Sequence, residues 1–154
     1  MTPPPAPGRI LGLVVEGFEV YYDPGTDQFA HAAGLFGTRR IVVGPRWLLL
    51  PPRQKWALLL HESAHLRAHH LLERILFATV ALPLLWTPVG RWFGGRQELQ
   101  ADAFVCRRGY GVDMLQFLVC WPRGSDGDYY PGFARRTAAI EQRLRESEHD
   151  AAIA

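Results

Sequence analysis

The N-terminal part of the chain carries short apolar runs of the kind that form β-strands. Ile10 to Tyr22 is rich in Val, Phe and Tyr and predicts one or two strands, which the turn-forming run Asp23-Pro24-Gly25 ends. Phe29 to Phe36 predicts a second strand region and Arg40 to Val43 a third, with Gly37 suited to the turn between them. This pattern predicts a small, mainly antiparallel sheet.

Beyond residue 50 the pattern becomes helical. A helix is predicted from about Arg53 to about His70, because two prolines suit its first turn and neither Gly nor Pro interrupts it. The other predicted segments are helices over Arg96–Arg108 (before the C-cap Gly109), Val112–Trp121 and Phe133–Glu148, and a loop over Arg123–Tyr130. The predicted fold class is therefore α+β, with the sheet packed on the helix of residues 53–70 and a helical C-terminal half.

Length and composition favour one compact domain. The chain has 154 residues, of which 48% are apolar and 21% charged, an ordinary balance for a globular protein. Residues 10–148 are predicted to form this domain, with a proline-rich flexible arm at residues 1–9 and a flexible tail at residues 149–154. The arm lacks the apolar segment of a secretory signal.

Charge and cysteine content limit the partners and the compartment. The net charge of +2 is too small to indicate a nucleic-acid binder, so nucleic acid is not expected as a partner. The two cysteines, Cys106 and Cys120, are too few for a disulfide framework and suit a reducing compartment. A cytoplasmic location is therefore expected.

The run His61-Glu62-Ser63-Ala64-His65 is an HExxH motif. Residues four apart share one face of a helix, so both imidazoles can reach one ion, and zinc accepts such nitrogen ligands. Glu62 projects beside this face and is predicted to act as the general base. The alternative, a solvated helix with surface histidines, is opposed by the apolar neighbours Leu58 to Leu60.

Two further histidines follow the motif. His65 and His69 are also four apart, but no glutamate follows His65, so this second register lacks a base. His69 and His70 are expected at the far end of the helix, near solvent.

A second acidic pair lies downstream, where Glu98 and Asp102 are four apart on one predicted helical face. HExxH followed by Glu98-Leu99-Gln100-Ala101-Asp102 resembles the gluzincins, and specifically the HtpX-like and CaaX prenyl endopeptidase family. The resemblance implies a zincin-like (gluzincin) domain with one Zn²⁺ per chain, held by His61, His65 and Glu98. It also implies that Asp102 orients a ligand histidine, a common role for a carboxylate near a metal.

Weaker parts of the resemblance extend from about Val20 to Leu144. Gln28-Phe29-Ala30 is similar to a family segment, and Tyr130-Pro131 followed by Arg136 is similar to a family His-Pro pair followed by Arg. The family histidine is Tyr130 here, which is a departure from the pattern. The segment before Glu98 is also shorter than the two transmembrane helices of membrane-bound members, so a minimal soluble or peripheral member is expected.

Leu71 to Gly95 is the most hydrophobic stretch. Its apolar run from Ile75 to Gly90 is shorter than the roughly 20 residues that a bilayer needs. His61 and Glu98 must also lie on one side of any membrane if they bind one metal. The stretch is interpreted as core, while a lid over the site and a peripheral membrane contact through residues 71–93 remain open.

These residues together predict a zinc-dependent endopeptidase acting on peptides or unfolded proteins. Glu62 would take a proton from the attacking water, and Tyr129, Tyr130 and Arg136 are candidates to stabilise the transition state. An extended substrate would pair with a strand at the rim of the cleft. The residues predicted for this rim strand are Phe29, Ala30, His31, Ala32 and Ala33.

Other interpretations use the same residues. One is a regulatory zincin that cleaves a single partner, and another is a non-catalytic, zinc-stabilised binding module, which would not need Glu62. Cys106 could approach the metal as an inhibitory thiolate, although a core cysteine is the favoured interpretation. The C-terminal tail, with Glu146, Glu148 and His149, could block the site, but a solvated helix end is favoured. Oligomeric state and cleavage specificity are not predicted.

Overall fold

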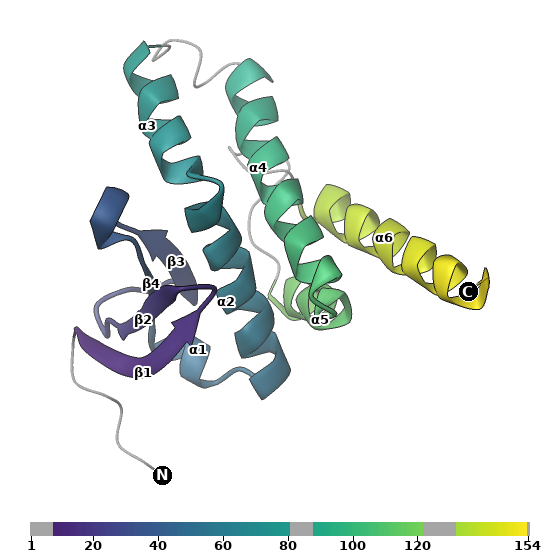
Figure 1. The fold of residues 1–154 in the computed structure, drawn as a ribbon, viewed down its shortest axis with the longest axis horizontal. Coiled ribbons are helices and arrows are strands. Elements are labelled where there is room, and N and C mark those ends of the chain that lie inside the picture. The colour runs from purple at the N-terminus through teal and green to yellow at the C-terminus, as the bar shows by residue number, and fades with distance from the viewer. Residues whose placement is uncertain (1–7, 81–87, 122–131, 154) are drawn as a thin grey trace. The chain divides into compact units, whose positions relative to one another are not determined.

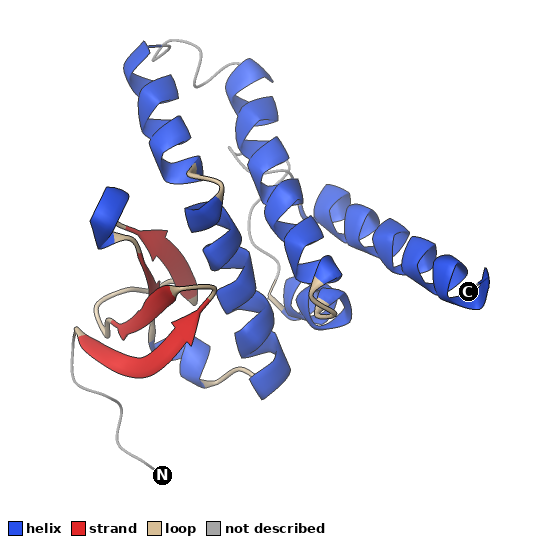
Figure 2. Ribbon diagram, in the orientation of Figure 1, coloured by secondary structure: helices blue, strands red, loops and turns tan. Residues whose placement is uncertain are grey.

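The computed structural model describes residues 8–80, 88–121 and 132–153. The chain is a mixed α+β protein, with four strands and short helices first and only helices afterwards (Figures 1 and 2). It divides into two compact units, residues 1–72 and residues 73–154, which we call the sheet unit and the helical unit. The predicted α+β class and helical C-terminal half are confirmed.

The sheet unit contains a four-stranded sheet in the order β1-β2-β4-β3. β1 pairs with β2 and β3 with β4 in antiparallel fashion, while β2 and β4 run parallel, so the predicted mainly antiparallel sheet is confirmed. Residues 10–22 form two strands because Glu16 and Gly17 turn the chain, with φ angles of 51° and 87°. The strands are β1 (Arg9–Val15), β2 (Phe18–Tyr22), β3 (Ala30–Ala33) and β4 (Arg40–Val43).

Two short helices flank β4 and were not predicted. The 3₁₀ helix η1 (Phe36–Thr38) replaces the end of the strand predicted to reach residue 36. The Thr38 hydroxyl donates to the Leu35 carbonyl at 2.8 Å and so closes this turn locally. Helix α1 (Pro45–Leu48) has proline at its first position, where the missing N–H costs nothing.

Helix α2 (Pro52–Arg67) packs on the sheet through contacts with β3, β4 and β1. Both surfaces are apolar, with the largest buried side chains at Ile41, Leu59 and Leu66. Burying one such side chain contributes about 1.5–3 kcal/mol. This interface holds the HExxH helix against the sheet, as predicted from the sequence.

The prediction that α2 continues to His70 was wrong. The helix ends at Arg67, and its C-cap Ala68 donates its N–H to the carbonyl of Ala64 at 3.0 Å. His69 follows with a φ of 56°, a left-handed conformation that interrupts any right-handed helix. A new helix, α3 (His70–Val80), begins at the next residue, and the unit boundary falls within it.

The helical unit contains the rest of α3 and three further helices. Its core is apolar, with Ala101, Val105, Met114, Phe117 and Ile140 at or below 5% exposed. Helix α4 begins eight residues before the predicted Arg96, and α6 continues beyond the predicted Glu148. The helices are α4 (Pro88–Arg107), α5 (Gly111–Cys120) and α6 (Phe133–Ile153).

In the described residues, none of the helices combines the length and the apolar character that crossing a bilayer requires. Residues 71–80 and 88–93 of the hydrophobic stretch belong to α3 and α4, while residues 81–87 lie outside the described part. A peripheral membrane contact through residues 71–93 stays a prediction.

Candidate functional site

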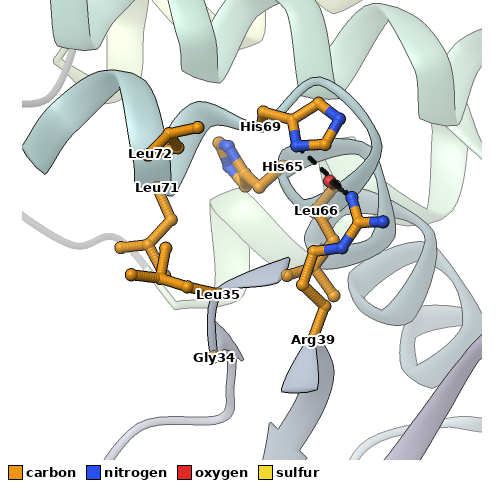
Figure 3. Close-up of a pocket in the computed structure, with 8 residues that line it drawn as sticks. All are labelled: Gly34, Leu35, Arg39, His65, Leu66, His69, Leu71 and Leu72. Carbon is orange, nitrogen blue, oxygen red and sulfur yellow. Dashed lines mark hydrogen bonds between the residues drawn. The ribbon is translucent and has the colours of Figure 1, made fainter. Parts of the chain in front are cut away.

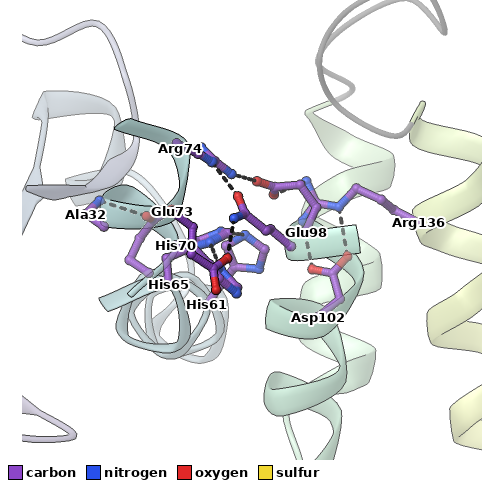
Figure 4. A network of polar contacts seen from close by, with 11 residues as sticks. Ala32, His61, His65, His70, Glu73, Arg74, Glu98, Asp102 and Arg136 are labelled. Carbon is purple, nitrogen blue, oxygen red and sulfur yellow. Dashed lines mark hydrogen bonds and ion pairs between the residues drawn. The ribbon is translucent and has the colours of Figure 1, made fainter. Parts of the chain in front are cut away.

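Two buried histidines of α2 point toward each other. The Nε2 atoms of His61 and His65 are 3.1 Å apart, and the rings meet edge to face with centroids 4.8 Å apart (Figure 4). Both residues are buried, at 4% and 8% exposed. Their spacing of four residues places both rings on one helical face. The sheet unit therefore brings together the two predicted histidine ligands.

Glu62 lies between them in sequence and faces the edge of the sheet. Its Oε2 accepts a hydrogen bond from the Ala32 backbone N–H at 2.8 Å. β3 is the last strand in the sheet order, and this contact shows that the Ala32 N–H points away from β4. The carboxylate predicted as the base is thus held at the sheet edge predicted to form the substrate rim.

His70 was not predicted to belong to the site. It is buried, at 3% exposed, and its Nδ1 lies 2.8 Å from Nδ1 of His65. The expectation that His69 and His70 both lie near solvent holds for His69 and is wrong for His70. The sequence did not indicate this contact, because a continuous helix would place His70 about 140° around the axis from His65 and so on a different face.

Glu98, the predicted third ligand, lies on α4 in the helical unit and is 4% exposed. Arg74 donates to its Oε1 at 3.0 Å, and Arg136 lies 3.5 Å from its Oε2 (Figure 4). A buried carboxylate needs such compensation, because leaving water without a partner is costly. Arg74, from α3, was not singled out in the sequence.

Asp102 lies one turn further along α4 and is 1% exposed. Arg136, from the first turn of α6, donates to both of its oxygens, at 2.8 and 2.7 Å. This fork-like geometry is among the strongest arrangements of a carboxylate and a guanidinium. The helical unit therefore brings Glu98, Asp102 and Arg136 together, while a role of Asp102 in orienting a histidine stays a prediction.

The buried side-chain amide of Gln97 extends the hydrogen bonds around Glu98. Gln97 accepts a hydrogen bond from Arg74 Nε at 2.6 Å and donates to Glu73 at 2.9 Å. The adjacent residue Glu98 is bound by the same arginine. Gln97 and Arg74 thus help to fix the rotamer of the α4 carboxylate. Their sequence neighbourhood gave no motif that could have indicated this.

A small pocket lies beside His65 in the sheet unit (Figure 3). At its edge, Arg39 donates to the Leu66 carbonyl at 3.0 Å and lies 3.4 Å from His69 Nδ1. The cavity volume of about 20 Å³ suits roughly one water molecule, so the pocket does not define a substrate subsite. Its lining residues are Gly34, Leu35, Arg39, His65, Leu66, His69, Leu71 and Leu72.

The remaining predicted residues have different surroundings. Ala30 to Ala33 form β3 and are half-buried, whereas Phe29 precedes the strand, is 3% exposed and lies under the Arg46 guanidinium. Tyr129 and Tyr130 lie outside the described residues.

Cys106 was considered as an inhibitory thiolate. Burial, followed by the nearby Asp102 carboxylate, raises the pKa of the Cys106 thiol, which disfavours a thiolate.

Comparison with solved structures finds a similar fold in Ste24p from S. mikatae, with a TM-score of 0.60. The match covers 79% of this chain and 44% of that chain at 17% sequence identity. The chain therefore spans less than half the length of this structure, and the likeness at this identity concerns the fold alone. No protein-family model matches the chain, and no curated protein matches it.

Proposed function

We propose that the chain is a zinc-dependent peptidase with a zincin-like site, in which His61, His65 and Glu98 hold one zinc ion. Among the described residues, these three buried side chains are a group that could hold a metal ion. Two imidazole nitrogens and a carboxylate oxygen form a donor set typical of catalytic zinc, which keeps a further position open.

The observation that carries the proposal is the distance between the two histidine nitrogens. Nitrogens bound to one tetrahedral zinc at about 2.0–2.1 Å lie about 3.3–3.4 Å apart. The Nε2 atoms of His61 and His65 are 3.1 Å apart in a buried setting. A small relaxation of either ring would therefore fit both nitrogens to one ion.

Glu62 supplies the base in this proposal. Bound zinc would lower the pKa of a coordinated water to about 7. The Glu62 carboxylate takes the proton of the attacking water and passes it to the leaving amine. Glu62 suits this role because it adjoins the first histidine ligand, His61. A purely structural zinc site has no need of a base.

The hydrogen bond between Glu62 and the Ala32 N–H suggests how a substrate engages. An extended peptide that pairs with the outer edge of β3, the last strand in the sheet order, would use the Ala32 N–H as a donor. The peptide carbonyl would then replace Glu62 at this N–H, which releases the carboxylate for proton transfer. Peptides or unfolded protein segments are the proposed substrates, because they can adopt the extended conformation.

The fold comparison is compatible with this proposal. The chain has a fold similar to that of Ste24p, and its zinc motifs resemble those of the CaaX prenyl endopeptidase family. The activity is inferred from the motif resemblance and from the His61, His65 and Glu98 group, while the comparison adds a similar fold.

The test compares the wild-type chain with Glu62→Gln. We expect about one zinc per chain in both, and hydrolysis of an unfolded substrate such as casein only by the wild type. Loss of turnover by orders of magnitude at equal zinc content would assign the base to Glu62. Equal turnover in the two proteins contradicts the mechanism. Zinc in both proteins with turnover in neither would favour a zinc-stabilised binding module.

A further inference from the structure

We propose that His70 is a positioning residue that fixes the ring orientation and the tautomer of His65; this rests on the function proposed above. The Nδ1 atoms of the two rings are 2.8 Å apart, and the ring centroids 5.0 Å. Both histidines are buried. The two nitrogens of His65 thus have different neighbours, Nε2 facing His61 and Nδ1 facing His70.

Hydrogen bonding at these two nitrogens determines whether His65 can serve as a ligand. A neutral imidazole has one N–H and one lone pair. To offer the Nε2 lone pair to zinc, His65 must carry its proton on Nδ1, where it donates to Nδ1 of His70. His70 must then carry its own proton on Nε2. The reverse direction would place the His65 proton on Nε2 and block the ligand.

The backbone places His70 for this contact. In a continuous helix, position 70 would lie about 140° around the axis from position 65. The left-handed φ of 56° at His69 ends the right-handed path, and α3 starts at His70. Arg39 supports this break through its hydrogen bond to the Leu66 carbonyl. The interruption between α2 and α3 therefore directs the His70 ring back onto His65.

A histidine in this place differs from the more common partners of a metal-bound histidine. Carboxylates and backbone carbonyls only accept hydrogen bonds, whereas an imidazole accepts only at its unprotonated nitrogen. Asparagine places a carbonyl oxygen near the position of His70 Nδ1. An acceptor there should keep the function, and an apolar group of similar size should lose it.

The experiment uses the full chain and a matched pair of variants, His70→Asn and His70→Leu. Their side chains have the same branched arrangement of heavy atoms, but only asparagine can accept from His65 Nδ1. The zinc dissociation constant is measured by competition with a chelator, and the unfolding midpoint of the zinc-free proteins by urea titration. His69→Asn is the control, because asparagine tolerates a positive φ and position 69 is exposed.

We expect His70→Leu to weaken zinc binding by roughly 10–100-fold. His70→Asn should recover most of this loss, and His69→Asn should bind like the wild type. The proposal is overturned if His70→Leu binds zinc as tightly as the wild type, or if both His70 variants lose affinity equally. A wild-type chain that binds no zinc would instead overturn the proposed function, and this proposal with it.

Discussion

Several polar side chains of the candidate site have partners that limit their orientation. His65 lies between His61 and His70, Glu62 is held by the Ala32 N–H, and Asp102 is held by Arg136. The spacing of the motifs predicted which histidines and carboxylates lie together, because helical periodicity fixes which residues share a face. It could not predict most of their partners, since these come from segments brought close by folding.

The pairing of Asp102 with Arg136 should contribute to the stability of the helical unit. Asp102→Ala leaves the Arg136 guanidinium, whose side chain is 14% exposed, without its bidentate partner. We expect the free energy of unfolding to fall by about 3 kcal/mol, since breaking a largely buried pair is costly. Urea denaturation of the zinc-free protein measures this, and an unchanged midpoint would contradict it.

The same variant tests the role that the family resemblance implies. If Asp102 also orients a ligand histidine, zinc affinity should fall by roughly 10–100-fold. A loss confined to stability would limit Asp102 to its pairing with Arg136. Glu141→Ala, an exposed substitution in α6, serves as the control and should change neither quantity.

Cys106 gives a prediction about pH. Because burial and the Asp102 carboxylate raise the pKa of this thiol, less of it is thiolate at pH 8 than in an ordinary cysteine. We expect Cys106 in the Cys120→Ser variant to react with iodoacetamide more slowly at pH 8 than a model thiol. The rate should rise on going to higher pH. Fast labelling below pH 7 would instead indicate a stabilised thiolate.

At the scale of elements, sequence patterns predicted the strands and helices better than their ends. Proline and composition placed the start of α2, but the break at residues 68–69 has no Gly or Pro to indicate it. The start of α4 at Pro88 was also missed, because Gly94 and Gly95 weaken the helical signal although both are buried within the helix. Tertiary packing decides whether a segment with glycines is helical, since each glycine costs only about 1 kcal/mol in a helix.

The break after α2 can be tested by two substitutions at His69. His69→Gly should keep or slightly raise stability, because glycine adopts a φ of 56° without strain. His69→Val should lower the free energy of unfolding by about 1–2 kcal/mol, since a β-branched residue is poorly tolerated there. Thermal or urea unfolding of both variants measures the difference. Equal stability would contradict the left-handed conformation at this residue.

At the scale of the whole molecule, the α+β class and the succession of a sheet and then helices could be predicted, while the division into two compact units could not. Boundaries between such units depend on long-range contacts, which local periodicity does not report. The predicted flexible tail begins at residue 149, whereas α6 continues to Ile153. Its last turns are exposed at residues 145–151 and add little to the core.

Truncation after Leu144 tests the tail. Because the removed residues are exposed, we expect zinc content to be unchanged and the free energy of unfolding to fall by less than about 1 kcal/mol. Turnover of casein should equal that of the full chain. A faster truncated enzyme would show that the C-terminal residues inhibit the site.

The proposed zinc site has two histidines and one carboxylate as its protein ligands. X-ray absorption at the zinc edge, on the purified chain with about one bound zinc, tests this ligand set most directly. Zinc held by His61, His65 and Glu98 should show nitrogen and oxygen neighbours at about 2.0–2.2 Å, with scattering from two imidazole rings and none from sulfur. A sulfur neighbour at about 2.3 Å, or a chain that binds no zinc, would contradict this ligand set.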